Sequence, residues 1–221
     1  MTPSYAFDAV WDPFRVSPLV AERHLTAPLR WRKPRKRVLV RGLFDEHGTD
    51  EQRDRAFAAM ALAPSHGFCV VAEDAVAMRE WFDRFGSGAL PATVCALKLV
   101  KAGIISELDF MRAGDLNTWP PPNVRPGTVI HDQETAERIP VLLQTPAASR
   151  FVVCKLRGAV NLRVALGFQF QCQGCTPYAG PGAQPDCPGH RVEPIDWIVV
   201  SPTTEPCDVA WVRSVVKQGK D

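Results

Sequence analysis

A chain of 221 residues, 46% of them hydrophobic, can bury one sizeable core, either as a large single domain or as a domain with a small appendage. Its net charge of only +2 excludes a whole-molecule field that favours nucleic acid, so such binding would need local basic clusters. The sequence shows neither a signal-peptide pattern nor an apolar run long enough to span a bilayer, so we expect a cytoplasmic protein without membrane contacts.

Residues 1–36 are rich in proline and aromatic residues and show no sustained hydrophobic period, which predicts an N-terminal arm laid over a domain. Its last residues begin the basic segment RWRKPRKR. Such a segment can contact phosphates while its indole stacks on a base, or it can be a solvated lead-in to a strand with Trp31 packed. The packed interpretation is favoured; the candidate nucleic-acid-binding residues are Arg30, Trp31, Arg32, Lys33, Arg35, Lys36 and Arg37.

Short β-branched runs then alternate with helical patterns over residues 37–221. Pro140 is expected to kink one helix and Asp208 to cap the last one. Periodicity leaves residues 86–126 open, as two short helices or a weak strand. The alternation predicts a partial (β/α) barrel or an open parallel sheet, with strands at 37–40, 67–71, 127–130, 150–153 and 196–200 and helices at 51–62, 74–85, 133–144 and 208–217.

The cysteines divide into dispersed and clustered ones. Cys69 and Cys154 lie inside apolar runs, where a small buried thiol is the usual interpretation, so a disulfide framework is not expected. A predicted insertion at about residues 168–194 contains CQGCTPYAGPGAQPDCPGH, in which a Cys-x2-Cys pair precedes a Cys-x2-His pair. Two such pairs supply the four ligands of a closed, structural zinc site, so we predict zinc on Cys172, Cys175, Cys187 and His190. The alternative is a loop with free thiols.

Several segments in order along the chain resemble a phage and prophage family of radical-SAM-like proteins of largely uncharacterised function. They include LRWRKPR, FAAMALAP, AMREW, ERIPVLLQTPAASRFVVC, NLRVAL and IDWIVV. The resemblance covers most of residues 11–213. It implies a partial β/α barrel with an N-terminal cysteine motif that would hold an iron–sulfur cluster.

The chain departs from that family where the cluster would be bound. In the family, a VSP tripeptide is followed at once by Gly-Cys, two residues and Cys-Tyr-Ala-Glu. Here VSPLVAERH keeps residues 16–18 and 21–23 of that pattern and lacks the cysteines, and the first 68 residues contain none. Because such clusters are held by thiolates, we expect no iron–sulfur cluster.

The predicted strand ends also differ from the family. The chain reads VRGLFDEHG, VVAEDAV and SPTTEPCD in place of the family's polar segments, and Lys155 stands where the family has an acid. Barrel chemistry is built at these ends, so the resemblance extends to the scaffold and not to the reactive rim. A new acid–base or metal site is an alternative to ordinary loop and capping roles, which are favoured, for Asp45, Glu46, His47, His131 and Asp132.

The favoured hypothesis is a pseudoenzyme, a radical-SAM-like scaffold that has lost its cluster and catalysis and binds nucleic acid or a phage or host protein. One alternative is an active enzyme of unknown reaction that uses the surviving rim residues. Another is a zinc-ribbon protein that binds nucleic acid through the basic segment.

Overall fold

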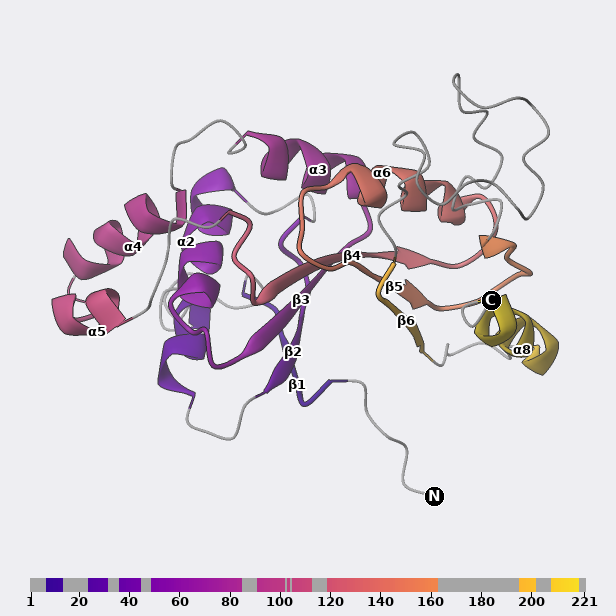
Figure 1. The fold of residues 1–221 in the computed structure, drawn as a ribbon, viewed down its shortest axis with the longest axis horizontal. Helices are drawn as coiled ribbons and strands as arrows, with labels where there is room; N and C mark the ends of the chain where they lie inside the picture. Colours follow the sequence, from indigo (N-terminus) through magenta and orange to yellow (C-terminus); the bar gives the residue numbers. More distant parts are fainter. Residues whose placement is uncertain are drawn as a thin grey trace, which may run out of the picture.

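The computed structural model describes residues 7–13, 24–31, 36–44, 49–84, 91–101, 103, 105–112, 119–162, 195–201 and 208–218. They form a sheet flanked by helices (Figure 1). The sheet has six strands in the order of the sequence, and every neighbouring pair is parallel. The strands are β1 (Ala9–Trp11), β2 (Arg37–Val40), β3 (Gly67–Ala72), β4 (Val124–Ile130), β5 (Phe151–Cys154) and β6 (Trp197–Val200).

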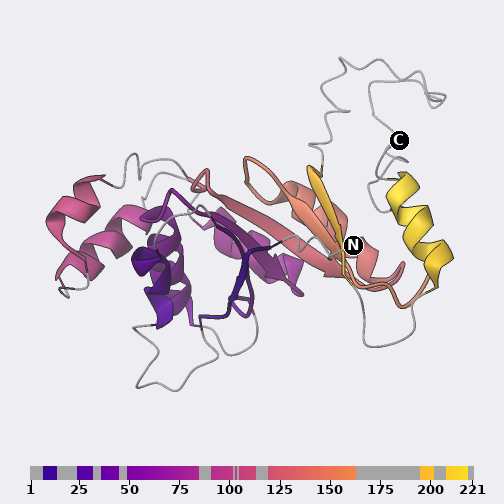
Figure 2. The same ribbon diagram turned by 90° about the horizontal axis from the view of Figure 1, so that it is seen from below.

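The helices confirm the predicted β/α alternation. Four of them place buried or partly buried apolar residues against one face of the sheet, which we call the helix face. Two further helices lie at the opposite end of the molecule from α8 (Figure 2): the first packs beside α2, and the second contacts the first. The four are α2 (Asp50–Ala61), α3 (Ala75–Asp83), α6 (Arg138–Gln144) and α8 (Val209–Gln218); the two are α4 (Pro91–Lys101) and α5 (Glu107–Arg112).

The other face of the sheet, which we call the inward face, is covered by side chains of the strands and by Phe7. Phe7 precedes β1, yet its ring lies 5.3 Å from that of Trp197 on β6. Arg37 on β2 also reaches Trp197, with its guanidinium carbon 5.4 Å from the ring centroid. Three strands separate β2 from β6, so the sheet is curled into an open half-barrel whose two edges approach each other at the amino ends.

Three details differ from the sequence prediction or complete it. The predicted arm contributes strand β1, which is too short to show a period in sequence. Pro140 does not kink a helix, because a 3-10 turn (Thr135–Glu137) comes first and Pro140 then lies in the first turn of α6, where its missing N–H costs little. Helices α4 and α5 answer the open question for residues 86–126. The predicted cap is confirmed: Asp208 accepts a bond from the amide of Ala210 at 2.7 Å.

Gly127 lies on the inward face, and a neighbouring ring occupies the space that a side chain would fill there. It lies opposite Phe151 in the β4–β5 register, and a Cβ atom there would stand 2.4 Å from the Phe151 ring. The ring of Phe151 in turn contacts Phe7 and Trp197, with centroids 6.3 and 6.1 Å away. The bare Cα of Gly127 therefore makes room for the aromatic cluster that closes the amino end.

We expect Gly127→Ala to lower the free energy of unfolding by roughly 1–3 kcal/mol, because the Phe151 ring has to leave its contacts with Phe7 and Trp197. Gly67→Ala on β3 is the matched control, since a Cβ there meets no atom within 4 Å. Urea unfolding of the two variants measures the difference. Equal effects of the two substitutions would show that the Phe151 ring can move aside without a loss of stability.

Candidate functional site at the carboxyl edge of the sheet

Each strand of the inward face ends in a polar residue. Along β4, β5 and β6 the inward positions Val129, Val153 and Val199 are 4%, 5% and 9% exposed. Two residues further on, where the side-chain alternation returns to the same face, every strand has a polar side chain instead of an apolar one. The same alternation along β1, β2 and β3 identifies the residue that follows each of these strands on the inward face. Together, the six strands give a carboxyl edge that consists of Asp12, Arg41, Glu73, His131, Lys155 and Ser201.

The loops after β4 and β5 are tied to each other around His131. The carbonyl of His131 accepts bonds from the amides of Arg157 at 2.7 Å and Gly158 at 3.3 Å. The side chain of Gln133 accepts a further bond from the amide of Asn161 at 2.7 Å. These contacts fix the position of the two loops before any ligand arrives.

The imidazole of His131 is held by the same pair of loops. Its Nδ1 lies 3.0 Å from the carbonyl oxygen of Lys155, and a carbonyl can only accept, so Nδ1 carries the hydrogen. The other ring nitrogen, Nε2, has no hydrogen-bond partner within the described ranges. This is the arrangement in which a backbone carbonyl orients a histidine whose second nitrogen meets a ligand.

Asp132 has the capping role that was favoured from the sequence. Its carboxylate accepts bonds from the Thr135 amide and hydroxyl, both at 2.9 Å, and these bonds hold the pKa of Asp132 below its ordinary value. The Thr135 hydroxyl oxygen accepts the amides of His131 and Asp132 in return. The carboxylate of Asp132 is therefore engaged in its own loop.

Lys155 and Ser201 continue the sheet beyond the last assigned strand residues. The amide of Lys155 donates to Ile130 and that of Ser201 donates to Cys154, each at 2.9 Å. Both residues are partly buried. No ion pair joins Lys155 to an acid in the part of the chain that the structure describes.

On the first two strands the edge is tightly packed around Gly42. This glycine has a φ of +78°, and a Cβ there would stand 2.7 Å from Oδ1 of Asp12. His24 supports the same corner, since its Nε2 lies 2.9 Å from the Asp12 carbonyl and its own carbonyl accepts the indole N–H of Trp11 at 3.1 Å. The Asp12 carboxylate thus lies directly against the backbone that follows β2.

The basic segment packs at the amino end of the sheet. The ring of Trp31 lies 6.3 Å from that of Phe68, nearly parallel to it, with the Lys36 ammonium 5.4 Å from the Trp31 centroid. Arg37 packs on Trp197 as described above. These contacts agree with the packed interpretation of Trp31. Residues 32–35, which include Arg32, Lys33 and Arg35, lie outside the described residues.

The predicted zinc ligands Cys172, Cys175, Cys187 and His190 also lie outside the described residues, as do Asp45, Glu46 and His47. Within the described ranges, no group of three or more His, Cys, Asp or Glu side chains could hold a metal ion. Cys69 and Cys154 are buried free thiols, as predicted. Burial raises the pKa of Cys69 to about 11 and that of Cys154 to about 12.

A protein-family model matches residues 4–221 of the chain. The chain belongs to this family, described as "Protein of unknown function (DUF5131)". No curated protein and no solved structure matches it. The matched range includes the whole described sheet, and with it the carboxyl edge, and the family description names no activity. No described helix of this family member is long and apolar enough to cross a membrane.

Sequence reasoning found only part of this edge. It singled out His131 and Asp132, and it placed Lys155 and the segments VRGLFDEHG, VVAEDAV and SPTTEPCD at strand ends, but it did not choose Arg41, Glu73 or Ser201 within those segments. The signal that could have found them is a polar residue directly after each apolar strand run. Their neighbourhood depends on the register between strands, which the sequence does not state.

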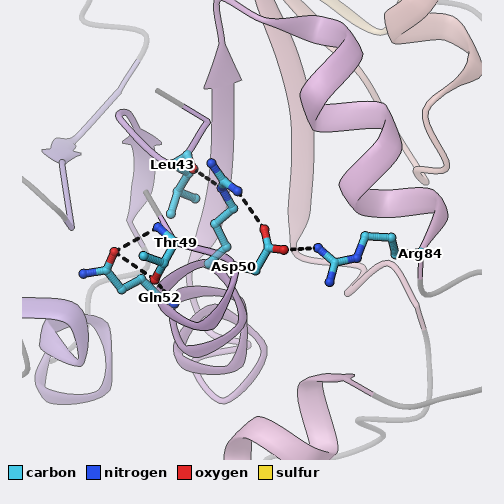
Figure 3. A network of polar contacts seen from close by, with 6 residues as sticks. Leu43, Thr49, Asp50, Gln52 and Arg84 are labelled. Atoms are coloured by element: carbon cyan, nitrogen blue, oxygen red, sulfur yellow. Dashed lines mark hydrogen bonds and ion pairs between the residues drawn. The ribbon is translucent and has the colours of Figure 1, made fainter. Parts of the chain in front are cut away.

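A second polar network, at the start of α2, is structural (Figure 3). Thr49 and Gln52 form a reciprocal capping box, and Asp50 bridges Arg53 at 2.8 Å and Arg84 beyond the end of α3. The bond from Arg84 holds the pKa of Asp50 below its ordinary value. Arg53 also donates to the carbonyl of Leu43 at 2.7 Å, so this network joins α2 to α3 and to the loop after β2.

Asp54, one turn further along α2, has a buried Oδ1 without a hydrogen-bond partner in the described part of the chain. Burial raises its pKa, and the positive charges of Arg84 and Lys98 only partly oppose this. Because the folded protein holds the Asp54 proton more strongly than the unfolded chain does, the Asp54 charge destabilises the fold increasingly as the pH rises above the ordinary value of 3.8.

We therefore expect Asp54→Asn to raise the free energy of unfolding at pH 7 by roughly 1 kcal/mol, because it removes a poorly solvated charge. The gain should shrink as the pH is lowered toward 4, where the wild-type carboxyl becomes protonated. Glu51→Gln, at an exposed position on the same helix, should change stability by less than about 0.5 kcal/mol. Urea unfolding at several pH values measures both; a destabilised Asp54→Asn variant would contradict the account.

Proposed function

We propose that this chain is a binding protein built on a radical-SAM-like half-barrel that has lost the iron–sulfur cluster and, with it, catalysis. Two features support the proposal: the ordered segments that resemble such proteins, and the parallel half-barrel, which is the fold that the resemblance implies. Its partner is a nucleic acid or a phage or host protein. The single observation that carries the binding role is the preorganised carboxyl edge around His131 and Lys155.

The residues present do not fit a cluster at the place where the resemblance would put it. The first 68 residues contain no cysteine. Cys69 belongs to the inward face and Cys154 to the helix face, so the two thiols lie on opposite sides of the sheet. Burial keeps both protonated, whereas cluster ligands are thiolates. No step of any reaction is therefore assigned to a cluster.

An active enzyme that uses the rim residues is the second candidate, and His131 is the observation that favours it. Its Nδ1–H is fixed by the Lys155 carbonyl, which leaves Nε2 able to accept a proton from a bound substrate. A zinc-ribbon protein that binds nucleic acid through the basic segment has less support. The Trp31 ring that would stack on a base already packs against Phe68 and Lys36.

We also propose that Cys172, Cys175, Cys187 and His190 hold one structural zinc ion. The support is the paired spacing of the four residues in a glycine- and proline-rich segment, together with the free thiols of Cys69 and Cys154, which indicate a reducing compartment. The same free thiols support a cytoplasmic location.

The first test of the proposed function is chemical. After anaerobic reconstitution with iron and sulfide, the protein should bind no stoichiometric cluster, and under reducing conditions it should form no 5′-deoxyadenosine from S-adenosylmethionine. Iron and sulfide analysis and chromatography of the reaction mixture measure the two outcomes. Formation of 5′-deoxyadenosine above a protein-free blank would overturn the proposal.

The second test concerns the metal. The purified protein should contain about one zinc ion per chain, and Cys187→Ser should lose it, because three ligands hold structural zinc poorly. Cys207→Ser is the matched control and should keep the metal, since Cys207 lies outside the ligand set. Elemental analysis of the three proteins decides the matter. Zinc that remains at full stoichiometry in Cys187→Ser would show that the spacing is coincidental.

A further inference from the structure

We propose that the corner formed by His131, Lys155 and Ser201 binds a phosphate group of the ligand. This inference rests on the proposed binding function and names the chemistry of what is bound. The three residues lie at the carboxyl ends of β4, β5 and β6, each one register step beyond the last paired residues of its strand. We call them the polar corner.

The register makes the three side chains neighbours. Ile130 pairs with Cys154 and Cys154 with Val200, so His131, Lys155 and Ser201 follow at adjacent positions of the same row. Adjacent strands lie about 4.8 Å apart, so the three side chains start within about 10 Å of one another. The bonds from the amides of Lys155 and Ser201 to the preceding strand keep this row in place.

The charge of the polar corner favours an anion. The ammonium of Lys155 has no acidic partner within the described ranges, and the nearest acid along the chain, Asp132, is engaged by Thr135. Glu73 follows β3 and lies opposite Val129, two residues before His131 in register, and it is exposed to solvent. Charges on exposed side chains are well screened by water, so the partly buried Lys155 contributes more to the field at the corner than the exposed Glu73 does.

The donors of the polar corner suit a phosphate. Lys155 supplies a compact positive charge of the kind that commonly binds phosphate, and Ser201 supplies a hydroxyl. His131 offers Nε2, which can accept a hydrogen bond from a phosphate hydroxyl because Nδ1 carries the ring hydrogen. The buried side chains of Val129, Val153 and Val199 precede them on the same face of the sheet. This apolar surface lowers the local dielectric constant and so strengthens the attraction between a bound oxyanion and Lys155. The interlocked loops supply this geometry without rearrangement.

Titration calorimetry with inorganic phosphate at constant ionic strength tests this inference on the full chain. Lys155→Met keeps most of the side-chain volume and should weaken phosphate binding by about tenfold or more, because a charge-assisted bond is lost. Ser201→Ala should weaken it by a smaller factor. Lys101→Met, the same substitution at an exposed lysine of α4 on the far side of the molecule, should leave phosphate binding unchanged (Figure 1). Circular dichroism of each variant checks that it is folded.

Two further probes identify the source of the phosphate. Adenosine monophosphate carries a phosphomonoester, and an oligothymidylate without terminal phosphates carries only diesters. Tighter binding of the first, lost in Lys155→Met, supports the inference and assigns a small phosphomonoester. Tighter binding of the second, lost in the same variant, supports it and assigns a nucleic-acid backbone.

The inference is overturned if wild-type protein binds none of the three probes at millimolar concentration, or if Lys155→Met and Lys101→Met bind them equally. This outcome is distinct from failure of the proposed function. Formation of 5′-deoxyadenosine would contradict the proposed function, whether or not the protein binds phosphate. A protein that forms no 5′-deoxyadenosine and binds no phosphate would contradict only the proposal that the polar corner binds a phosphate group.

Discussion

The ring of Phe151 on the bare backbone of Gly127 is the contact on which the shape of the sheet depends. From that position the ring contacts Phe7 and Trp197, while the Arg37 guanidinium lies over the Trp197 ring. Phe7 precedes the edge strand β1, and Trp197 lies on the other edge strand, β6. Their contact draws the edges together at the amino ends, and six parallel strands that could have formed a flat sheet become a half-barrel.

Aromatic side chains fill the amino end of the half-barrel, so a ligand site is expected at the carboxyl end. Parallel strands bring all their carboxyl ends to one edge, and the curl turns the side chains of that edge toward a common centre. The row of valines beneath it has no polar group that could select a ligand. Selection is left to six polar side chains, of which His131, Lys155 and Ser201 stand on the most firmly tied backbone.

The two described cysteines are part of the packed scaffold and not of the polar carboxyl edge. Cys69 and Cys154 fill space on opposite faces of the sheet, and burial suppresses the thiolate form in both. They behave as small apolar residues. The chain has a half-barrel sheet, lacks the cysteines that its resemblance would require after residue 18, and has Lys155 at its rim. These features support the proposal of an anion-binding protein without radical chemistry.

The sequence by itself determined most of the framework, because burial imposes a pattern on single elements. Short β-branched runs such as residues 67–71 and 150–153 predicted parallel strands, and the helical pattern at 74–85 predicted the helix whose Met78, Trp81 and Phe82 are buried in the core. Capping by Asp208 and Asp132 was also visible, since a cap depends on residues a few positions away. The fourfold cysteine and histidine spacing is likewise a property of the sequence.

Only the tertiary structure decided which residues meet across the sheet. Strand β1 is three residues long, so its place beside β2 follows from pairing and not from periodicity. The contact of Phe7 with Trp197 joins residues at opposite ends of the chain, and the row of His131, Lys155 and Ser201 exists only in one register of β4, β5 and β6. A shift of one residue would turn those side chains to the other face, because strand side chains alternate, and register is set by packing between strands.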